Sequence, residues 1–468
     1  MPLILPSNSI SGEFEVANSL RFDDGSSDYL NKTFSTPTNN DICTLSFWIK
    51  KTGFSNHAIW SNGTTNENET NFVFQESGKF EFKEDVSNSA TFQLITNRLF
   101  RDPSAWYHFV IAFDTTQATS SNRVKLYVNG SQETSFATET YPSQNTNIAI
   151  NSNIAQYIGR RNRATDQYFD GYLAEMVFVD GQQLDPTSFG EFDEDTGIWK
   201  PIDVSGLTFG TNGFYLDFEN SGSLGADVSG NGNNFTVNNL TSIDQTTDTC
   251  TNNYPTINSL ENYNSSFTLS EGNLKAVTSN YSFIRSTIGV ASGKWYMEVK
   301  CTAQTSNTNK WSFGISDVPA SSSTQCLGND NYTYTWRGDA DKVYYNGSNT
   351  TYGTDGGMST GMIVGIALDL DNNKIYWSRN GTWRNSADPS AGTNGFSIVA
   401  PSSTNNGFYH FTFGECDGTY NFTFETNYGN PPFTISSGNS DGNGFGQFEY
   451  QPPSGYLALC TKNLATDG

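Results

Sequence analysis

Closely spaced carboxylates are the residues of this chain that could cleave a glycosidic bond. That reaction needs two carboxyl groups that flank the bond, one as the nucleophile or base and the other as the general acid. The nearest stretch is EFDEDT, where Glu191 and Asp193 are followed by Thr196 at the position of the acid. This segment is expected to be a loop, and Asp217 with Glu219 is no better placed. The sequence therefore predicts that the protein is not an enzyme.

Histidine and cysteine offer little alternative chemistry. The chain has three histidines, so few residues could form a Ser-His-Asp site or a histidine-rich metal site. His108 lies inside an apolar run, where a hydrogen-bonded core histidine is favoured over a base. The six cysteines form no CxxC motif, which argues against zinc and against a disulfide-dense scaffold. Free thiols are expected.

An aromatic stretch in the second half of the chain could hold a sugar. Sugars place their CH faces on aromatic rings, while their hydroxyls bond to polar side chains. The candidates, in and just after NDNYTYTWRGD, are Tyr332, Tyr334, Trp336, Arg337, Tyr344 and Tyr345. Alternating strand residues that pack on a sheet would give the same pattern. We predict a glycan- or partner-binding site here, with that alternative open.

Oxygen donors gather at two places in the first half. Asp23, Asp24 and Asp28 lie within one short stretch, and together with Asp170 they are the candidate calcium ligands. The loop at 227–234, DVSGNGNN, is the second place. It holds one carboxylate among amides, so a tight solvated turn is favoured over a calcium loop. Calcium is the one cofactor that the sequence suggests.

Strands and tight turns must position these residues. Residues 361–383 comprise an apolar run, an Asx-rich turn, an alternating strand and the pair Asn380-Gly381. Asn-Gly favours the type I′ turn of a β-hairpin. Ile375 and Trp377 are expected on the buried face of this strand, with Tyr376 on the opposite face. Residues 106–130 repeat the plan and end in the same Asn-Gly pair. Two β-sandwich modules of similar architecture are therefore predicted.

Composition supports an all-β protein. Charged residues are 16% and aromatics 14% of the 468 residues, and strands and turns favour this composition. The net charge is −23, from 25 Lys and Arg against 48 Asp and Glu. That charge repels phosphate backbones and anionic membranes, so no nucleic-acid partner is expected. No segment approaches ~18 consecutive apolar residues, so no membrane insertion is expected. The first residues lack the basic region of a secretory signal.

Six segments in the first half carry a family resemblance. They are SLRFDDGSSDYL, CTLSFWIKKTG, WYHFVIAFD, VKLYVNG, YIGRR and FDGYLAEMVFVDGQQLDPTSFGEF, in this order. Over about residues 15–195 the chain resembles a laminin-G or pentraxin-like module of the concanavalin A-like lectin/glucanase superfamily. The resemblance implies a two-sheet jelly roll that binds glycans or proteins. It also implies that a calcium site could lie near a loop rim, in the region of the four candidate ligands.

The second half carries two further resemblances. GVASGKWYMEVKC, KWSFGISD, GMIVGIALDLDNNKIYWSRNGTW and FYHFTFGE resemble a SPRY domain over about residues 274–430, another sandwich of the same class. SPRY surfaces of animal proteins capture peptides, but the loop residues that do so are not recognisable here. FYLDFENSGSLGADVSGNGNNFTVNN and GQFEYQPPSGYLALCTKNLA are similar to segments of structural proteins of marine bacteriophages, cyanophages especially.

These resemblances imply two tandem concanavalin A-like jelly-roll sandwiches. The expected division is an arm at 1–14, a first sandwich at 15–200, a second at 201–435 with a leading strand and loop at 201–273, and a tail at 436–468. The phage resemblance implies a virion structural protein, assembled in the host cytoplasm and exposed on the particle as a tail fibre, appendage or capsid decoration. Expected partners are other virion proteins, host surface glycan and copies of itself, trimers by analogy. A stand-alone lectin is the alternative, and a divergent glycosidase is less favoured.

Overall fold

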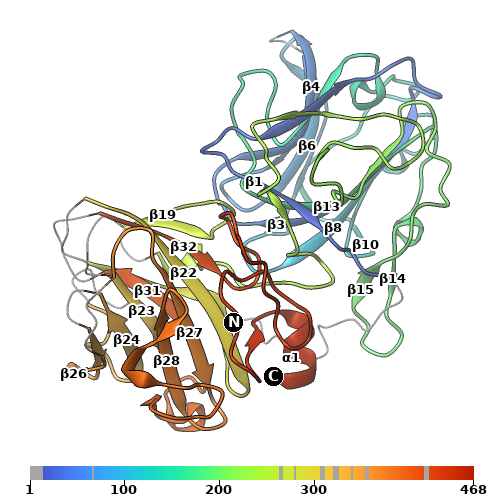
Figure 1. Cartoon of the computed structure of the whole chain (residues 1–468). Coiled ribbons are helices and arrows are strands. Elements are labelled where there is room, and N and C mark those ends of the chain that lie inside the picture. The colour runs from blue at the N-terminus through green and yellow to red at the C-terminus, as the bar shows by residue number, and fades with distance from the viewer. Residues whose placement is uncertain are drawn as a thin grey trace. The chain divides into compact units, whose positions relative to one another are not determined.

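The computed structural model describes residues 14–65, 68–262, 267–278, 281–305, 311–319, 326–338, 341–353, 358–415 and 421–468. Contacts divide the chain into two compact units, a first unit that ends at Thr251 and a second unit from Asn252 to Gly468 (Figure 1). Each unit is a sandwich of two sheets whose strands are mostly antiparallel, as predicted. Residues 1–13 of the expected arm lie outside the described residues.

The first unit is built from two eight-stranded sheets. One runs β10 (Ser131–Glu133), β9 (Val124–Val128), β8 (Trp106–Asp114), β3 (Ile42–Lys51), β13 (Gly171–Asp180), β1 (Ser19–Phe22), β18 (Gln245–Thr246), with β16 (Phe214–Leu216) on β13. The other runs β11 (Phe136–Thr140), β7 (Ser89–Thr96), β6 (Phe80–Val86), β5 (Asn68–Phe74), β4 (His57–Thr65), β12 (Ala155–Ile158), β2 (Tyr29–Thr33), β17 (Thr236–Asn238). A separate hairpin joins β14 (Gly190–Phe192) to β15 (Trp199–Pro201).

Aromatic side chains fill the space between these sheets. The Trp60 ring stacks on Phe214 at 6.1 Å and on Phe178 at 5.8 Å between ring centroids. Alternation selects the buried face: Phe80 and Phe82 of β6 point into this core, while the intervening Glu81 is only half-buried. The outward-facing positions of β6 therefore remain free to form a site.

The strands of residues 201–251 complete the first unit, whereas the sequence predicts that these residues belong to the second sandwich. β16 pairs with β13, β17 with β2 and β18 with β1. The buried ammonium of Lys50 also bonds to Asp248 at 2.8 Å. These pairings join positions far apart in sequence, so no local sequence pattern predicts them. The boundary between the units lies between Thr251 and Asn252, and the predicted boundary between residues 200 and 201 is wrong.

Glu175 is a buried acid at an irregularity in β13. Its φ is 47°, and the register with β3 shifts between Ala174 and Val177, which is the geometry of a β-bulge. The Tyr215 hydroxyl donates to Glu175 Oε2 at 2.5 Å. Burial raises the pKa of Glu175 to about 8 from its ordinary value of 4.5. The carboxyl is therefore neutral inside the fold over most of the physiological range.

We expect this group to make the first unit less stable in alkali. An acid whose folded pKa lies above its unfolded value gives its full stabilisation below the unfolded value and loses it as the pH rises to the folded value. The free energy of unfolding should thus fall between about pH 4.5 and 8, and Glu175→Gln should reduce that fall. Urea unfolding across this range measures it, with the exposed Glu194→Gln as control. Equal pH profiles for Glu175→Gln and wild type would contradict the assignment.

The second unit pairs a nine-stranded with a six-stranded sheet. The larger runs β19 (Phe267–Ser270), β20 (Lys275–Thr278), β32 (Phe422–Asn427), β22 (Lys294–Gln304), β27 (Ile363–Asp369), β28 (Lys374–Arg379), β29 (Thr382–Trp383), with β30 (Phe396–Ser397) on β28 and β33 (Leu457–Ala458) on β22. The smaller runs β21 (Ser282–Val290), β31 (Tyr409–Glu415), β23 (Trp311–Ser316), β24 (Thr333–Arg337), β25 (Lys342–Tyr345), β26 (Ser348–Thr351).

The meander predicted at 361–383 forms as β27, β28 and β29, and Asn380 and Gly381 take positive φ in its tight turn. Ile375 and Trp377 are buried, as expected. The prediction of a half-buried strand is wrong, because Tyr376 on the opposite face is buried as well. The Tyr456 ring packs edge-on against Tyr376 at 6.4 Å. The C-terminal segment thus covers the outer face of β28.

Residues 436–468, expected to form a tail, are integrated into the second unit. β33 adds in parallel to β22, and α1 (Thr461–Asp467) follows it. The buried Glu298 of β22 accepts hydrogen bonds from the backbone N–H groups of Tyr450 at 2.8 Å and Glu449 at 3.0 Å. It also accepts from Asn427 Nδ2 at 3.2 Å. One carboxylate thereby fastens the returning chain to the sheet.

The helical content is small. Beside α1, the described chain has short 3₁₀ turns at Ser120–Asn122, Ala149–Asn151, Pro186–Ser188, Ser259–Glu261, Arg384–Ser386 and Pro401–Ser403. None of the helices in the described ranges is both long and apolar enough to span a membrane.

The cysteines do not all behave as expected. Cys43, Cys250, Cys301 and Cys460 are free thiols, as predicted. The same expectation is wrong for Cys326, which is disulfide-bonded.

Candidate functional site

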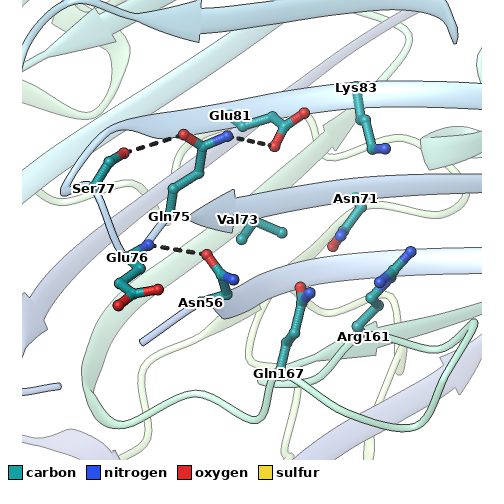
Figure 2. A pocket seen from close by; sticks show the side chains of 10 residues that line it. All are labelled: Asn56, Asn71, Val73, Gln75, Glu76, Ser77, Glu81, Lys83, Arg161 and Gln167. Atoms are coloured by element: carbon teal, nitrogen blue, oxygen red, sulfur yellow. Dashed lines mark hydrogen bonds between the residues drawn. The ribbon is translucent and has the colours of Figure 1, made fainter. Parts of the chain in front are cut away.

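A polar pocket lies on the outer face of the second sheet of the first unit. We call it the sheet-face pocket; its volume is about 340 Å³. Asn71 and Val73 of β5 form its floor, and Glu81 of β6 forms one wall (Figure 2). Arg161 and Gln167, from the segment after β12, form the opposite wall (Figure 2). Asn71, Val73 and Glu81 face away from the core because they alternate along their strands with buried phenylalanines.

The cations of the sheet-face pocket are already paired with carboxylates. Arg161 Nε and Nη2 donate to both oxygens of Glu69, at 2.7 and 2.9 Å, and this bidentate bonding raises the pKa of Arg161. Lys83 Nζ lies 2.9 Å from Asp85 Oδ2. Glu81 accepts from two glutamine side chains, at 2.8 and 2.6 Å. Because each cation among the described lining residues has a carboxylate partner, these residues offer no free positive charge to an anion.

Two amide oxygens in the sheet-face pocket lack partners. Asn71 Oδ1 and Gln167 Oε1 are buried atoms without a hydrogen bond in the structure, and a buried acceptor left unsatisfied costs about 1–3 kcal/mol. Both side chains line the pocket, so their acceptors suit a ligand that brings hydroxyl donors. Neither residue was among the candidates predicted from the sequence, although the polar alternation of β5 was a usable signal for Asn71.

The four candidate calcium ligands are not all brought together. Asp28 Oδ2 accepts from Asp23 N at 2.9 Å, and burial raises the pKa of Asp28 to about 7. Asp24 in the same turn is exposed. Asp170 instead lies beside His57, since a Cβ on Gly53 would come within 2.9 Å of Asp170 Oδ2 and 2.6 Å of His57 Nε2.

Within the described ranges, no group of three or more His, Cys, Asp or Glu is placed to hold a metal ion. In the loop at 227–234, the Asp227 carboxylate accepts instead from the backbone N–H groups of Tyr215, Ser229 and Asn233, which is the behaviour of a self-capped turn. Calcium binding stays a prediction.

The aromatic candidates separate onto two faces of one sheet. Tyr334 and Trp336 of β24 point inward, and Trp336 is fully buried, with its indole N–H on Asp341 at 3.1 Å. On the opposite face the Arg337 guanidinium lies 4.3 Å from the Tyr344 ring centroid. Tyr345, across from Tyr334 in the ladder, is half-buried. Tyr332 precedes β24 with φ 61° and is also half-buried.

Tyr334 and Tyr345 line a second hollow, the Tyr345–Phe396 groove, of about 650 Å³. The rings of Tyr345 and Phe396 meet at 5.1 Å and 63°. Exposed hydroxyl and amide side chains border them, those of Asn346, Thr350, Thr351, Asn385 and Ser397. The structure therefore brings two of the six predicted aromatic-site residues into a hollow, and Trp336 into the core.

The side chains considered for catalysis form ion pairs or hydrogen bonds with other residues of the fold. Glu191 and Asp193 sit on the β14–β15 hairpin, 3.2 and 3.5 Å from Lys200 Nζ. A hydrogen bond from Thr196 lowers the pKa of Asp193, the reverse of what a general acid needs. His108 is a buried core histidine: Trp199 Nε1 donates to its Nδ1 at 2.9 Å, so Nε2 carries the proton and donates to Ser46 Oγ at 2.8 Å.

Comparisons with known proteins agree with this architecture. Residues 24–184 match the concanavalin A-like lectin/glucanases superfamily, and residues 294–388 match the SPRY domain. A search of the curated proteins finds no match.

Three solved structures are similar to part of this chain. The SPRY domain of human HERC1 is 11% identical over 33% of this chain and 87% of that one, with a TM-score of 0.26. Stonustoxin is 18% identical over 37% of this chain and 27% of the stonustoxin chain, with a TM-score of 0.27. The native heptameric SAP-like pentraxin from Limulus polyphemus is 16% identical over 36% of this chain and 79% of the pentraxin chain, with a TM-score of 0.28. By its family matches, the chain joins a domain of the concanavalin A-like lectin/glucanases superfamily to a SPRY domain.

Proposed function

We propose that this protein is a non-enzymatic binding protein that holds glycan in the sheet-face pocket. Lectin-type domains of this class suggest a carbohydrate-binding or protein-interaction module. The observation that carries the proposal is the pair of unpartnered buried amide oxygens, Asn71 Oδ1 and Gln167 Oε1, in a pocket whose cations are neutralised. Sugar hydroxyls supply donors without charge, so they match this site better than a sulfated or sialylated ligand does.

The proposal places the protein on a bacteriophage particle. Its support is the similarity of two segments, in 214–239 and 446–465, to structural proteins of marine phages. There it would bind other virion proteins and assemble with copies of itself, and host surface glycan would be its external ligand. The ion pairing of Glu191 and Asp193 with Lys200 supports a role without catalysis.

Loss of either amide oxygen should weaken glycan binding. We expect Asn71→Ala and Gln167→Ala each to raise the Kd of a glycan found on an array by about three- to tenfold, which corresponds to one hydrogen bond. Titration calorimetry measures the change. Gln132→Ala removes an exposed amide from β10, on the other sheet, and should leave the Kd unchanged. Equal losses in all three variants would contradict a site in this pocket.

The virion role has its own test. Mass spectrometry of purified particles should detect the protein in stoichiometric amounts. Glycan binding by the isolated chain together with its absence from particles would instead establish the stand-alone lectin.

A further inference from the structure

We propose that the Tyr345–Phe396 groove of the second unit is a separate binding site for a neutral saccharide. This inference goes beyond the proposed function, because it concerns the other unit and shares no residue with the sheet-face pocket. Its volume of about 650 Å³ falls in the range of small-ligand sites.

The apolar part of the groove is an aromatic corner. Tyr345 and Phe396 are half-buried and meet at 5.1 Å, and the deeper Tyr334 ring lies parallel to Tyr345 at 6.4 Å between centroids. The two ring planes meet at 63°, so the rings together form a corner. A pyranose ring offers CH faces that fit such a corner, and its remaining edge keeps its hydroxyls free for polar neighbours.

The floor of the groove is held in place before any ligand arrives. Three tyrosine hydroxyls fasten the chain that carries Phe396. Tyr334 Oη accepts from Val399 N at 3.1 Å, Tyr409 Oη donates to Val399 O at 2.9 Å, and Tyr352 Oη donates to Asn394 O at 3.2 Å. A site whose walls are fixed in this way loses little conformational entropy on binding.

The polar part of the groove selects for an uncharged ligand. Of the described residues that line it, none is Asp, Glu, Lys, Arg or His. Its rim carries exposed hydroxyls and amides instead, such as Thr350, Thr351 and Asn385. In a protein of net charge −23, a groove without cations does not attract an anionic sugar. A saccharide brings several uncharged hydroxyls to these rim groups together with a CH face for the rings, so the saccharide is favoured.

The test uses the full chain with the sheet-face pocket weakened by Asn71→Ala and Gln167→Ala. The probes are maltotriose, cellotriose and N,N′-diacetylchitobiose, with 3′-sialyllactose as the anionic comparison, measured by saturation-transfer NMR and calorimetry. At least one neutral probe should bind. Tyr345→Ala should raise its Kd by at least about tenfold, while Tyr345→Phe, which keeps the ring, should stay within about threefold. Circular dichroism and melting curves verify the fold of each variant.

Tyr344→Ala is the matched control, because the neighbouring tyrosine lies on the opposite face of β25, against Arg337. It should not change the Kd. Three results would overturn the proposal: binding of none of the neutral probes, an equal loss in Tyr344→Ala, or equally tight binding of 3′-sialyllactose. Selection of peptides from a display library by wild type but not by Tyr345→Ala, without saccharide binding, would assign the groove to peptides. Because the groove shares no lining residue with the sheet-face pocket, which is already weakened in this background, failure here leaves the glycan site of the first unit untouched.

Discussion

A fragment of residues 14–200 is expected to lack a cooperative melting transition, while a fragment of residues 14–251 should have one. The longer fragment keeps six apolar side chains of the first core that the shorter one lacks: Phe214, Leu216, Phe218, Leu224, Phe235 and Leu240. Burial of one such side chain is worth about 1.5–3 kcal/mol. Six of them together contribute about 9–18 kcal/mol, which is as large as the roughly 5–15 kcal/mol by which a whole domain is stable.

The shorter fragment also loses a counter-ion. Lys50 is fully buried, and its ammonium lies 2.8 Å from the equally buried Asp248. Removal of one partner of a buried ion pair typically costs about 3–5 kcal/mol. Circular dichroism melting and binding of a hydrophobic dye compare the two fragments. If the fragment that ends at residue 200 melted cooperatively at the temperature of the longer one, the division between Thr251 and Asn252 would be wrong.

Glu298→Ala should destabilise the second unit by at least about 3 kcal/mol, since each buried donor left unpaired costs about 1–3 kcal/mol. Four donors converge on this carboxylate: the N–H groups of Glu449 and Tyr450, Asn427 Nδ2, and the Tyr296 hydroxyl at 3.1 Å. Without it, the segment that contains Glu449 and Tyr450 should also detach from β22, which protease digestion would reveal.

Two variants bracket this prediction. Glu298→Gln keeps the volume and part of the acceptor capacity, so its loss should be intermediate. Glu425→Ala on the adjacent β32 removes a carboxylate 4.0 Å from Lys275 Nζ, and such pairs are worth at most about 1 kcal/mol. Chemical denaturation followed by tryptophan fluorescence measures all three. A loss in Glu298→Ala no larger than in Glu425→Ala would show that the carboxylate does not hold the C-terminal segment.

Local sequence patterns predicted the strands and tight turns well, because those signals lie within a few residues. The turns at Asn129-Gly130 and Asn380-Gly381 have the positive φ angles that an Asn-Gly pair favours. Ile375 and Trp377 are buried where alternation placed them. The two-sandwich fold followed from these patterns together with the family resemblances.

Long-range pairings could not be read in the same way. Leu20 pairs with Gln245, and Trp295 with Leu457, so the membership of residues 201–251 and 436–468 depends on contacts that leave no local periodicity. The same limit explains Tyr376, whose outer face is covered by a tyrosine eighty positions away, Tyr456.

The candidate sites were predictable only in part. Alternation along β24 and β25 shows that Tyr345 and Tyr344 face opposite sides, but the depth of Trp336 depends on the sheet packed over it. The sheet-face pocket could have been anticipated as outward polar positions on two adjacent strands, Asn71 and Glu81 among them. Its opposite wall, with Arg161 and Gln167, arrives from a distant segment, and only the fold reveals it.

The way in which each sandwich is completed has a consequence for synthesis on the ribosome. All strands of the first sandwich have been translated once Thr251 is added, so this domain can fold while elongation continues at roughly 5–20 residues per second. The second cannot be completed until Tyr450 and Ala458 have emerged. Until then Glu298 of β22 lacks the N–H group of Tyr450, and the edge of β22 that pairs with β33 is unpaired. During that interval the nascent SPRY sheet is exposed to chaperones, and a stall before residue 450 would leave one finished domain tethered to one unfinished domain.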